Sequence, residues 1–328
     1  MAKTPSRWWP LIKLLPVKTN FRFMRYAKAY AAISLIATLA AAALTVFPMK
    51  PPCGGLNCGV DFRGGTALEL TTTRPADIGR IRSTLNGLNL GDVQVQTFGS
   101  PNNVLVRFET PENQNPSVAV ARARTALTQT LGAVKFSRTE VVGPKVSGEL
   151  FLKGVAALVL GITMMMVYIW FRFGFTFGVG AAAALLHDVM LTFGLFAVTQ
   201  IEFSLNSVAA ILTIIGYSVN DTVVVLDRVR ENLRKFKRMP LAEVIDLSIN
   251  ETLSRTAITG FTGLMALGVL AAFGGDSLFS FSIAMIFGIV VGTYSSFFVA
   301  GPVVMWLGVK RGDEPAEPLK PAAGLVRS

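Results

Sequence analysis

The stretch Ile214-Ile215-Gly216-Tyr217-Ser218-Val219-Asn220-Asp221-Thr222-Val223-Val224-Val225 carries one carboxylate inside an otherwise apolar run. An acidic side chain at the centre of a membrane helix costs about 3 kcal/mol on insertion scales, so it is expected to face protein or water and to have a function. At helical spacing Tyr217, Ser218 and Asp221 share one face, and Ser218 and Thr222 lie one turn apart. This polar stripe predicts a second polar helix packed against it.

Arg255 is the partner that we predict for Asp221, because Arg255, Thr259 and Thr262 share one face of a later apolar segment. A nearby arginine favours the charged form of a carboxylate and burial favours the neutral form, so a small helix movement could load or release a proton. We therefore interpret Asp221 and Arg255 as proton-pathway residues. The supporting polar side chains would be Tyr217, Ser218, Asn220, Thr222, Thr259, Asp188 and His187. Alternatively, Asp221 only fixes helix register or extends toward the nearby cytosolic surface.

The composition is that of a membrane protein. Of the 328 residues, 52% are hydrophobic and 16% are charged, which is too apolar for an ordinary soluble domain. The net charge of +11 comes from basic residues that cluster beside apolar spans, so it indicates orientation in a membrane and no nucleic-acid partner. The sequence indicates no catalytic set, no cofactor and no metal site.

The order of apolar and basic segments predicts six membrane spans with both termini in the cytosol. A basic N-terminus (1–26) precedes a first span (27–47), which at about 20 residues is longer than the apolar core of a signal peptide. A hydrophilic block (50–147) follows, and then five spans at 150–170, 174–198, 204–226, 254–273 and 278–307. Basic residues occur at Arg172, in the segment 227–253 and in the tail 308–328, so these should be cytosolic and the hydrophilic block extracytoplasmic. We expect 227–253 to be an amphipathic helix in the interface plane.

The hydrophilic block reads as a folded α+β domain. Alternating apolar residues predict strands at 67–72, 93–98, 104–109 and 134–142, with helices at 75–88 and 116–131. This βαββαβ order predicts a ferredoxin-like antiparallel sheet between the first and second spans. Asp61 and Arg63, just before it, alternate as on an extended strand.

The two cysteines of the chain, Cys53 and Cys58, directly follow the first span. An oxidising compartment outside the membrane favours a disulfide between them over a metal site.

His187 and Asp188 are adjacent in the third span, so we expect them to point about 100° apart and not to face the same neighbour. Asp188 lies deeper in its span from the cytosolic end than Asp221 does in its own span. We therefore expect Asp188 to be a second polar site along a proton path and not to contact Asp221 directly. The small residues of Gly288-xxx-Gly292, with Ser295 and Ser296 one turn on, predict close helix packing.

The residues Gly216–Asn232 closely resemble the fourth-span signature of the SecF family. Other segments with the same resemblance are Gly59–Thr66, Val142–Leu150, Leu186–Val189 and Glu251–Thr256. The resemblance implies a subunit of the accessory Sec translocase, related to proton-driven pumps of the resistance-nodulation-division type. Its partners would be SecD, the SecYEG channel, exported polypeptides and protons, and Asp221 and Arg255 fall on the family's proton-pathway positions.

Three other functions remain open from the sequence. A stand-alone efflux or lipid transporter would reuse the same Asp–Arg physics, and an assembly scaffold would use the charges as a structural pair. An intramembrane aspartyl protease would need Asp188 and Asp221 to share a proton.

Overall fold

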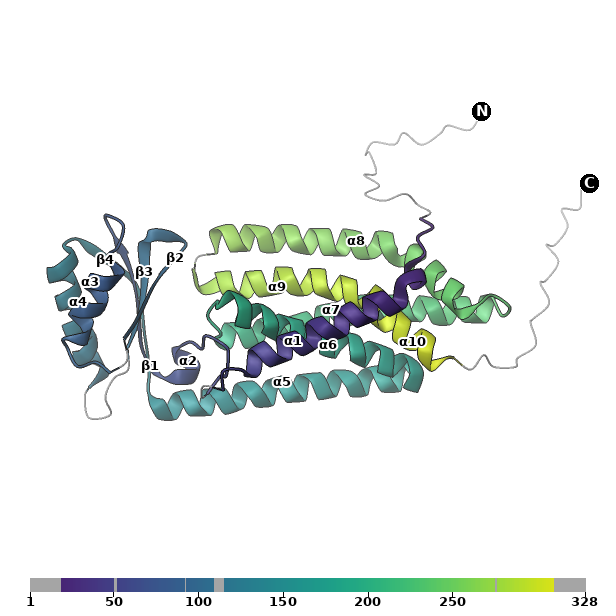
Figure 1. The fold of residues 1–328 in the computed structure, drawn as a ribbon, viewed down its shortest axis with the longest axis horizontal. Coiled ribbons are helices and arrows are strands. Elements are labelled where there is room, and N and C mark those ends of the chain that lie inside the picture. Colours follow the sequence, from purple (N-terminus) through teal and green to yellow (C-terminus); the bar gives the residue numbers. More distant parts are fainter. Residues whose placement is uncertain (1–18, 50–51, 92, 109–114, 275, 310–328) are drawn as a thin grey trace, which may run out of the picture.

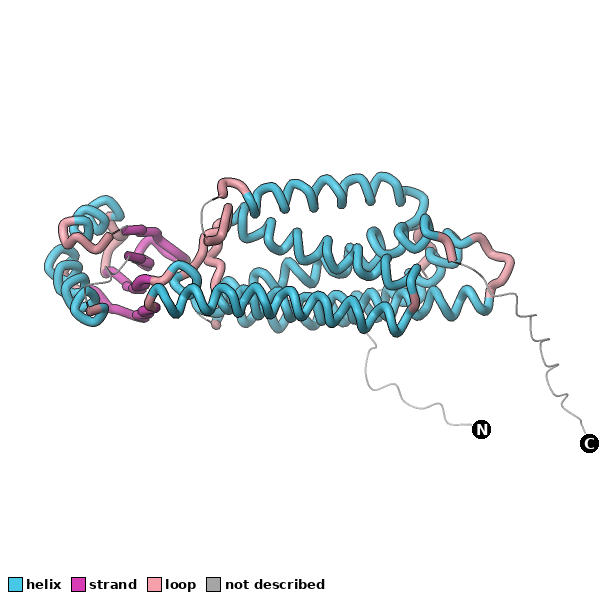
Figure 2. The backbone as a smooth tube through the Cα atoms, turned by 90° about the horizontal axis from the view of Figure 1, so that it is seen from below, coloured by secondary structure: helices cyan, strands magenta, loops and turns pink. Residues whose placement is uncertain are grey.

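The computed structural model describes residues 19–49, 52–91, 93–108, 115–274 and 276–309 of the chain. It consists of a long bundle of helices with a small unit of strands and helices at one end (Figure 1, Figure 2). The basic residues between positions 3 and 18 and most of the predicted tail 308–328 lie outside the described residues.

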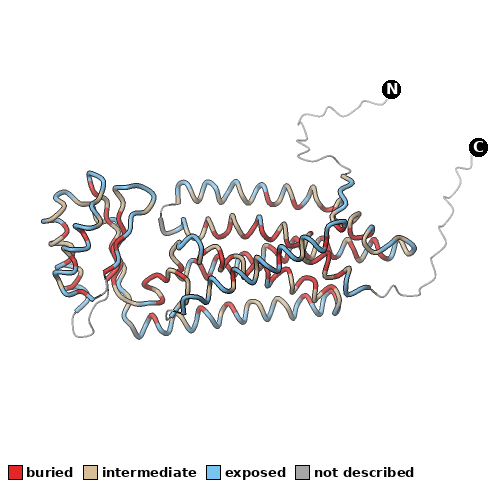
Figure 3. Tube along the Cα trace, in the orientation of Figure 1, coloured by how far each residue is buried: buried red, intermediate tan, exposed pale blue. Residues whose placement is uncertain are grey.

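Within the described residues, six helical segments are long and apolar enough to span a membrane, as the sequence predicts. They are built from α1 (Ala27–Val46), which follows the short η1 (Phe23–Tyr26), α5 (Pro144–Phe173), α6 (Phe175–Thr199), α7 (Leu205–Lys235), α8 (Leu241–Phe273), and α9 (Asp276–Ser295) with its continuations η2 (Ser296–Ala300) and α10 (Gly301–Leu307). α6, α7 and the α9 segment contribute most of the buried residues, whereas α1, α5 and α8 lie outside them (Figure 3). The helix that carries Asp221 is therefore at the centre of the bundle.

The segment 227–253 differs from the single interfacial helix that the sequence predicts. Residues up to Lys235 continue α7, and residues from Leu241 begin α8. Pro240 directly precedes α8, and a proline disfavours helical backbone at the residue before it. Glu251 of α8 accepts hydrogen bonds from Arg228 (2.6 Å) and Asn232 (2.7 Å) of α7. The polar residues of this segment therefore connect the ends of α7 and α8 to each other.

Close packing of α9 on α7 depends on glycine. A Cβ atom at Gly288 would overlap the side chain of Ile214, and one at Gly292 would lie 3.0 Å from Cβ of Ser218. The close approach predicted from these small residues is therefore confirmed.

The small unit contains β1 (Gly65–Thr72), α3 (Ile78–Asn86), β2 (Val93–Phe98), β3 (Ser100–Phe108), α4 (Pro116–Leu131) and β4 (Val134–Val142). The strands form one sheet in the order β2-β3-β1-β4, and all neighbours are antiparallel. Leu68, Val106 and Leu127 belong to the buried core that the sheet shares with α3 and α4. Both helices cover the face that points away from the bundle, so the opposite face points toward the helix ends (Figure 1).

Residues 60–63 are helical, and the prediction of an extended strand at Asp61 and Arg63 is wrong. They form the one-turn helix α2 (Val60–Arg63), which is followed by Gly64 at φ 77° and Gly65 at φ 102°. Those positive angles favour glycine and end the helix before β1. Val60 packs with the bundle-facing side of the sheet and Phe62 with the bundle core. α2 therefore lies between the helix bundle and the sheet and packs against both.

Candidate functional site

The polar stripe of α7 lies inside the bundle. Ser218, Asp221 and Thr222 are 1%, 3% and 1% exposed. α6, α8 and α9 all pack on α7. Polar groups at this depth need protein partners, because the surrounding side chains are apolar.

Asp188 is the most connected of the predicted residues. Its side chain on α6 is fully buried, and its Oδ2 accepts hydrogen bonds from Ser218 Oγ of α7 and from Ser295 Oγ of α9, the latter at 2.8 Å. The carboxylate thus ties three helices together. Asp188 contacts the helix of Asp221 but shares no hydrogen bond with Asp221 itself, so the paired acids of an aspartyl protease are not formed.

His187 and Asp188 do face the same neighbouring helix, contrary to the expectation from their 100° separation. The His187 ring stacks on Tyr294 with ring centroids 5.9 Å apart, and Asp188 meets the next residue, Ser295. His187 Nδ1 also lies 2.9 Å from Asp188 Oδ1. His187 and Asp188 of α6 therefore contact the adjacent residues Tyr294 and Ser295 of α9. The side chains extend far enough from the backbone for both to reach the same helix.

A second polar contact lies one turn along from the Asp188 cluster. Thr222 Oγ1 and Ser296 Oγ are 2.9 Å apart, and Ser296 opens the π-helical turn η2. Single π-helical turns are often found at functional sites in helices. Ser295 and Ser296 were predicted to serve helix packing alone, and their role as hydrogen-bond partners was missed. The available signal was a pair of hydroxyls inside an apolar span.

Asp221 and Arg255 interact electrostatically but form no ion pair in the structure. Asp221 is buried, and its Oδ2 has no hydrogen-bond partner among the described residues. Arg255 is exposed on α8. By helix rise, Asp221 is about 24 Å from the start of α7 at Leu205, and Arg255 is about 27 Å from the end of α8 at Phe273. The two charges therefore lie at similar depth.

Two more polar atoms near this position lack partners within the described part of the chain. They are Tyr217 Oη, one turn from Asp221 on α7, and Thr256 Oγ1, next to Arg255 on α8. Thr259, predicted to support Arg255, instead donates to the carbonyl oxygen of Arg255 at 2.9 Å, within its own helix. Buried polar groups without partners are rare in native proteins and call for an explanation.

One face of the site is open. Asn220 of α7 and Arg255 of α8 are exposed, although both lie within membrane-spanning helices. Polar side chains inside a membrane are expected to face protein or water, so this face is unsuited to lipid.

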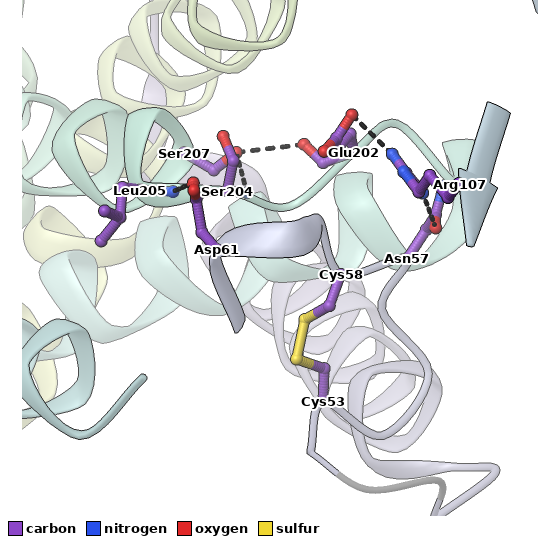
Figure 4. Close-up of a disulfide and its surroundings, with 9 residues drawn as sticks. All are labelled: Cys53, Asn57, Cys58, Asp61, Arg107, Glu202, Ser204, Leu205 and Ser207. Atoms are coloured by element: carbon purple, nitrogen blue, oxygen red, sulfur yellow. Dashed lines mark hydrogen bonds and ion pairs between the residues drawn. A yellow bond between two sulfur atoms is a disulfide. The ribbon is translucent and has the colours of Figure 1, made fainter. Parts of the chain in front are cut away.

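Cys53 and Cys58 form a disulfide, as predicted (Figure 4). Across the described ranges, no group of three or more His, Cys, Asp or Glu side chains is arranged to hold a metal ion.

Comparisons with known proteins agree with this architecture. The family described as "Protein export membrane protein SecD/SecF, C-terminal" matches residues 122–310. The protein translocase subunit SecF of Rhodobacter capsulatus is 43% identical, over 94% of this chain and 95% of its own length. SecF of Rickettsia rickettsii is 40% identical, over 89% of this chain and 94% of its own length.

A solved structure is also similar. SecDF from Thermus thermophilus, described as a translocon-associated membrane protein, superposes with a TM-score of 0.80 at 33% identity. The match covers 89% of this chain and 39% of the SecDF chain. Because the match to the SecF proteins extends over nearly the whole length of both sequences, the chain belongs to the SecF family of protein translocase subunits.

Proposed function

We propose that this chain is a subunit of a SecDF complex that uses the proton motive force to promote protein export through the SecYEG channel. Asp221 and Arg255 would form its part of the proton pathway. The observation that carries the proposal is the buried carboxylate of Asp221, which has an oxygen without a hydrogen-bond partner and a nearby arginine that does not pair with it. A carboxylate in a closed ion pair would have little freedom to exchange a proton.

Helix movement would control the proton. An arginine that approaches a carboxylate stabilises the charged form of the acid. When the arginine moves away, burial of the carboxyl group favours its neutral form. α8 packs on both α7 and α9, and its buried residues near Arg255 are Thr252, Thr256 and Gly260, which have small or short side chains. A shift of α8 along α7 would therefore change the distance from Arg255 to Asp221 without rebuilding a bulky interface.

SecD is the partner that we propose for the open face. Asn220 and Arg255 are exposed at the depth of the site, where lipid contact would be costly. The chain spans 39% of the solved SecDF chain, so more than half of that relative lies beyond the match, and we propose that the corresponding part of SecD covers this face. Transporters built from two related halves hold the coupling site near the interface of the halves.

The orientation that we propose follows the basic residues. Arg172 and the α7–α8 turn lie at the end of the bundle opposite the sheet (Figure 1). Basic loops stay in the cytosol, so in this proposal the sheet lies outside the inner membrane and both termini lie in the cytosol. The order βαββαβ with strands β2-β3-β1-β4 supports the ferredoxin-like assignment of this domain.

The test is export and proton flux in cells that carry Asp221→Asn. The amide keeps the shape of the side chain but cannot titrate, so we expect normal assembly with SecD and loss of activity to the level of cells without the chain. Arg255→Lys keeps the charge and loses the planar fork of donors, so we expect partial or complete loss. Asp227→Asn, at an exposed acid further along α7, is the matched control and should export normally.

Normal export by a well-assembled Asp221→Asn complex would contradict the proton-pathway role. Reduced complex abundance, with normal export by the complex that remains, would instead favour a structural role for Asp221 and the scaffold function.

A further inference from the structure

We propose that the loop closed by the disulfide, together with Arg107 and Glu202, is a coupling joint that holds the first turn of α7 to the extracytoplasmic sheet. The joint consists of residues 53–63, Arg107 of β3 and residues 200–207 (Figure 4). Through it, a movement of the sheet would be passed to the helix that carries Asp221. The inference rests on the proposed function in its last step, from helix movement to export.

The sheet contributes one arginine to the joint. Arg107 is 8% exposed, and its Nη2 lies 2.5 Å from Oε2 of Glu202, in the segment between α6 and α7. Its Nη1 donates to Oδ1 of Asn57 at 3.0 Å. The mostly buried guanidinium thus donates a hydrogen bond to the Asn57 amide and forms an ion pair with the Glu202 carboxylate, so one side chain of the sheet contacts two separate segments.

The disulfide loop contributes a set of backbone hydrogen bonds to the same segment. Phe203 N donates to the carbonyl oxygen of Asn57 at 2.8 Å, and Gly59 N donates to the carbonyl oxygen of Phe203 at 2.9 Å. Two side-chain amides add further hydrogen bonds. Asn57 Nδ2 donates to the carbonyl oxygen of Gln200 at 2.8 Å, and Gln200 Nε2 donates to the carbonyl oxygen of Gly55 at 3.0 Å. The Cys53–Cys58 bond closes this loop and so restricts the conformations from which these contacts form. It gives the disulfide a structural purpose.

The start of α7 is fixed by the neighbouring side chains. Leu205 N, at the first turn, donates to Oδ2 of Asp61 at 3.0 Å, and an acid at a helix N-terminus is favourable. Ser204 and Ser207 form a capping box, and Ser207 Oγ donates to the carbonyl oxygen of Glu202 at 3.2 Å. Glu202 is therefore linked both to the sheet and to the first turn of α7.

Beside the joint, a cavity of about 480 Å³ lies between the sheet and the helix ends, and its lining includes Glu69 of the sheet, Asn206 of α7 and Glu202 of the joint. Within the joint, Phe62 packs on Phe203 with ring centroids 5.7 Å apart. The sheet is connected to the helices here and where β4 continues into α5, and the cavity between them leaves it room to tilt. α7 is a single long helix that would carry that tilt about 24 Å to Asp221.

Arg107→Gln and Glu202→Gln test the joint in the full-length chain assembled with SecD in lipid nanodiscs. Arg138→Gln is the matched control, because Arg138 lies on the same sheet and makes its ion pairs with Glu69 and Glu140 of that sheet. We measure hydrogen exchange of the backbone amides in residues 203–208, and export in cells at equal complex abundance. Glu202 is the more exposed partner, so its variant still reports if Arg107→Gln fails to fold.

We expect amide exchange at the start of α7 to rise by about tenfold in both test variants, and export to fall with it, while Arg138→Gln changes neither. The exchanged pair Arg107→Glu with Glu202→Arg should recover part of both. Unchanged exchange would show that the contact does not hold α7, and faster exchange with normal export would show that it does not couple. A failure of the proton-pathway role would appear separately, as normal export by Asp221→Asn, and would leave the exchange comparison intact.

Discussion

Asp188 and Asp221 are both buried acids, yet their surroundings differ. Asp188 has hydrogen-bond partners on both carboxylate oxygens, from His187, Ser218 and Ser295. Asp221 has an oxygen with none among the described residues. A fully satisfied buried carboxylate rigidifies the structure around it, whereas an unsatisfied one is costly and is kept for a reason. The contrast is consistent with a supporting role for Asp188 and with the proposed proton-pathway role for Asp221.

Asp188→Ala should therefore reduce the stability of the bundle. It leaves the hydroxyls of Ser218 and Ser295 without their acceptor, at a cost of about 1–3 kcal/mol for each buried group that finds no other partner. Asp188→Asn should be milder, because the amide keeps one oxygen and serine hydroxyls can also accept. Thermal unfolding of the purified complex measures this. Asp227→Ala is the control, since its exposed ion pair with Arg172 is worth about 0–1 kcal/mol; equal melting of the Asp188→Ala and Asp227→Ala complexes would contradict the supporting role.

At the scale of helices, the contact between α7 and α9 leaves no room at Gly288. Gly288→Ala places a methyl group where Ile214 already lies, so the helices must separate, at a cost of about 1–3 kcal/mol. Gly268→Ala is the matched substitution on α8, where an added Cβ meets no atom within 4 Å. Helix propensity alone should make it neutral or slightly stabilising. Unfolding temperatures of the two variants give the comparison, and an unchanged value for Gly288→Ala would show that the packing is looser than the structure indicates.

The positions of the helices could be predicted from sequence, and so could the ends of α1 and α6, but the ends of α7 and α8 at their shared turn could not. A run of about 20 apolar residues is enough to locate a membrane span. α7 and α8 continue well past those runs, because Arg228 and Asn232 find partners in Glu251 across the turn. Such pairings between distant polar residues have no period in the sequence. The short helix α2 was missed for a related reason, since the contacts of Val60 and Phe62 with two different cores decide its form.

The candidate site was predictable on one helix and unpredictable between helices. Helical spacing places Ser218, Asp221 and Thr222 together on α7, and all three are buried. The partners of Ser218 and Thr222 come from α6 and α9, and the choice of those helices depends on tertiary packing. The expected closure of Arg255 on Asp221 is not seen, because Arg255 lies on the exposed side of α8.

At the scale of the whole molecule, the polar and charged groups discussed above are distributed along the length of α7. The sheet and the joint lie at one end of α7, the buried acids lie along its middle, and the charged α7–α8 turn lies at the other end (Figure 1). The continuous helix α7 connects these three regions. The arrangement fits a protein in which events on one side of a membrane are coupled to a charge inside it.

This arrangement predicts which ends an impermeant thiol reagent can reach in intact cells. Thr125, exposed on α4, should react after substitution by cysteine, whereas a cysteine at Arg234, near the end of α7, should react only after the membrane is permeabilised. The basis is the excess of arginine and lysine at the α7–α8 turn, which favours the cytosolic side. Cys53 and Cys58 are joined in a disulfide, so the unsubstituted chain is the blank. Labelling of Arg234→Cys in intact cells would reverse the orientation, and the sheet and its joint with α7 would then face the cytosol.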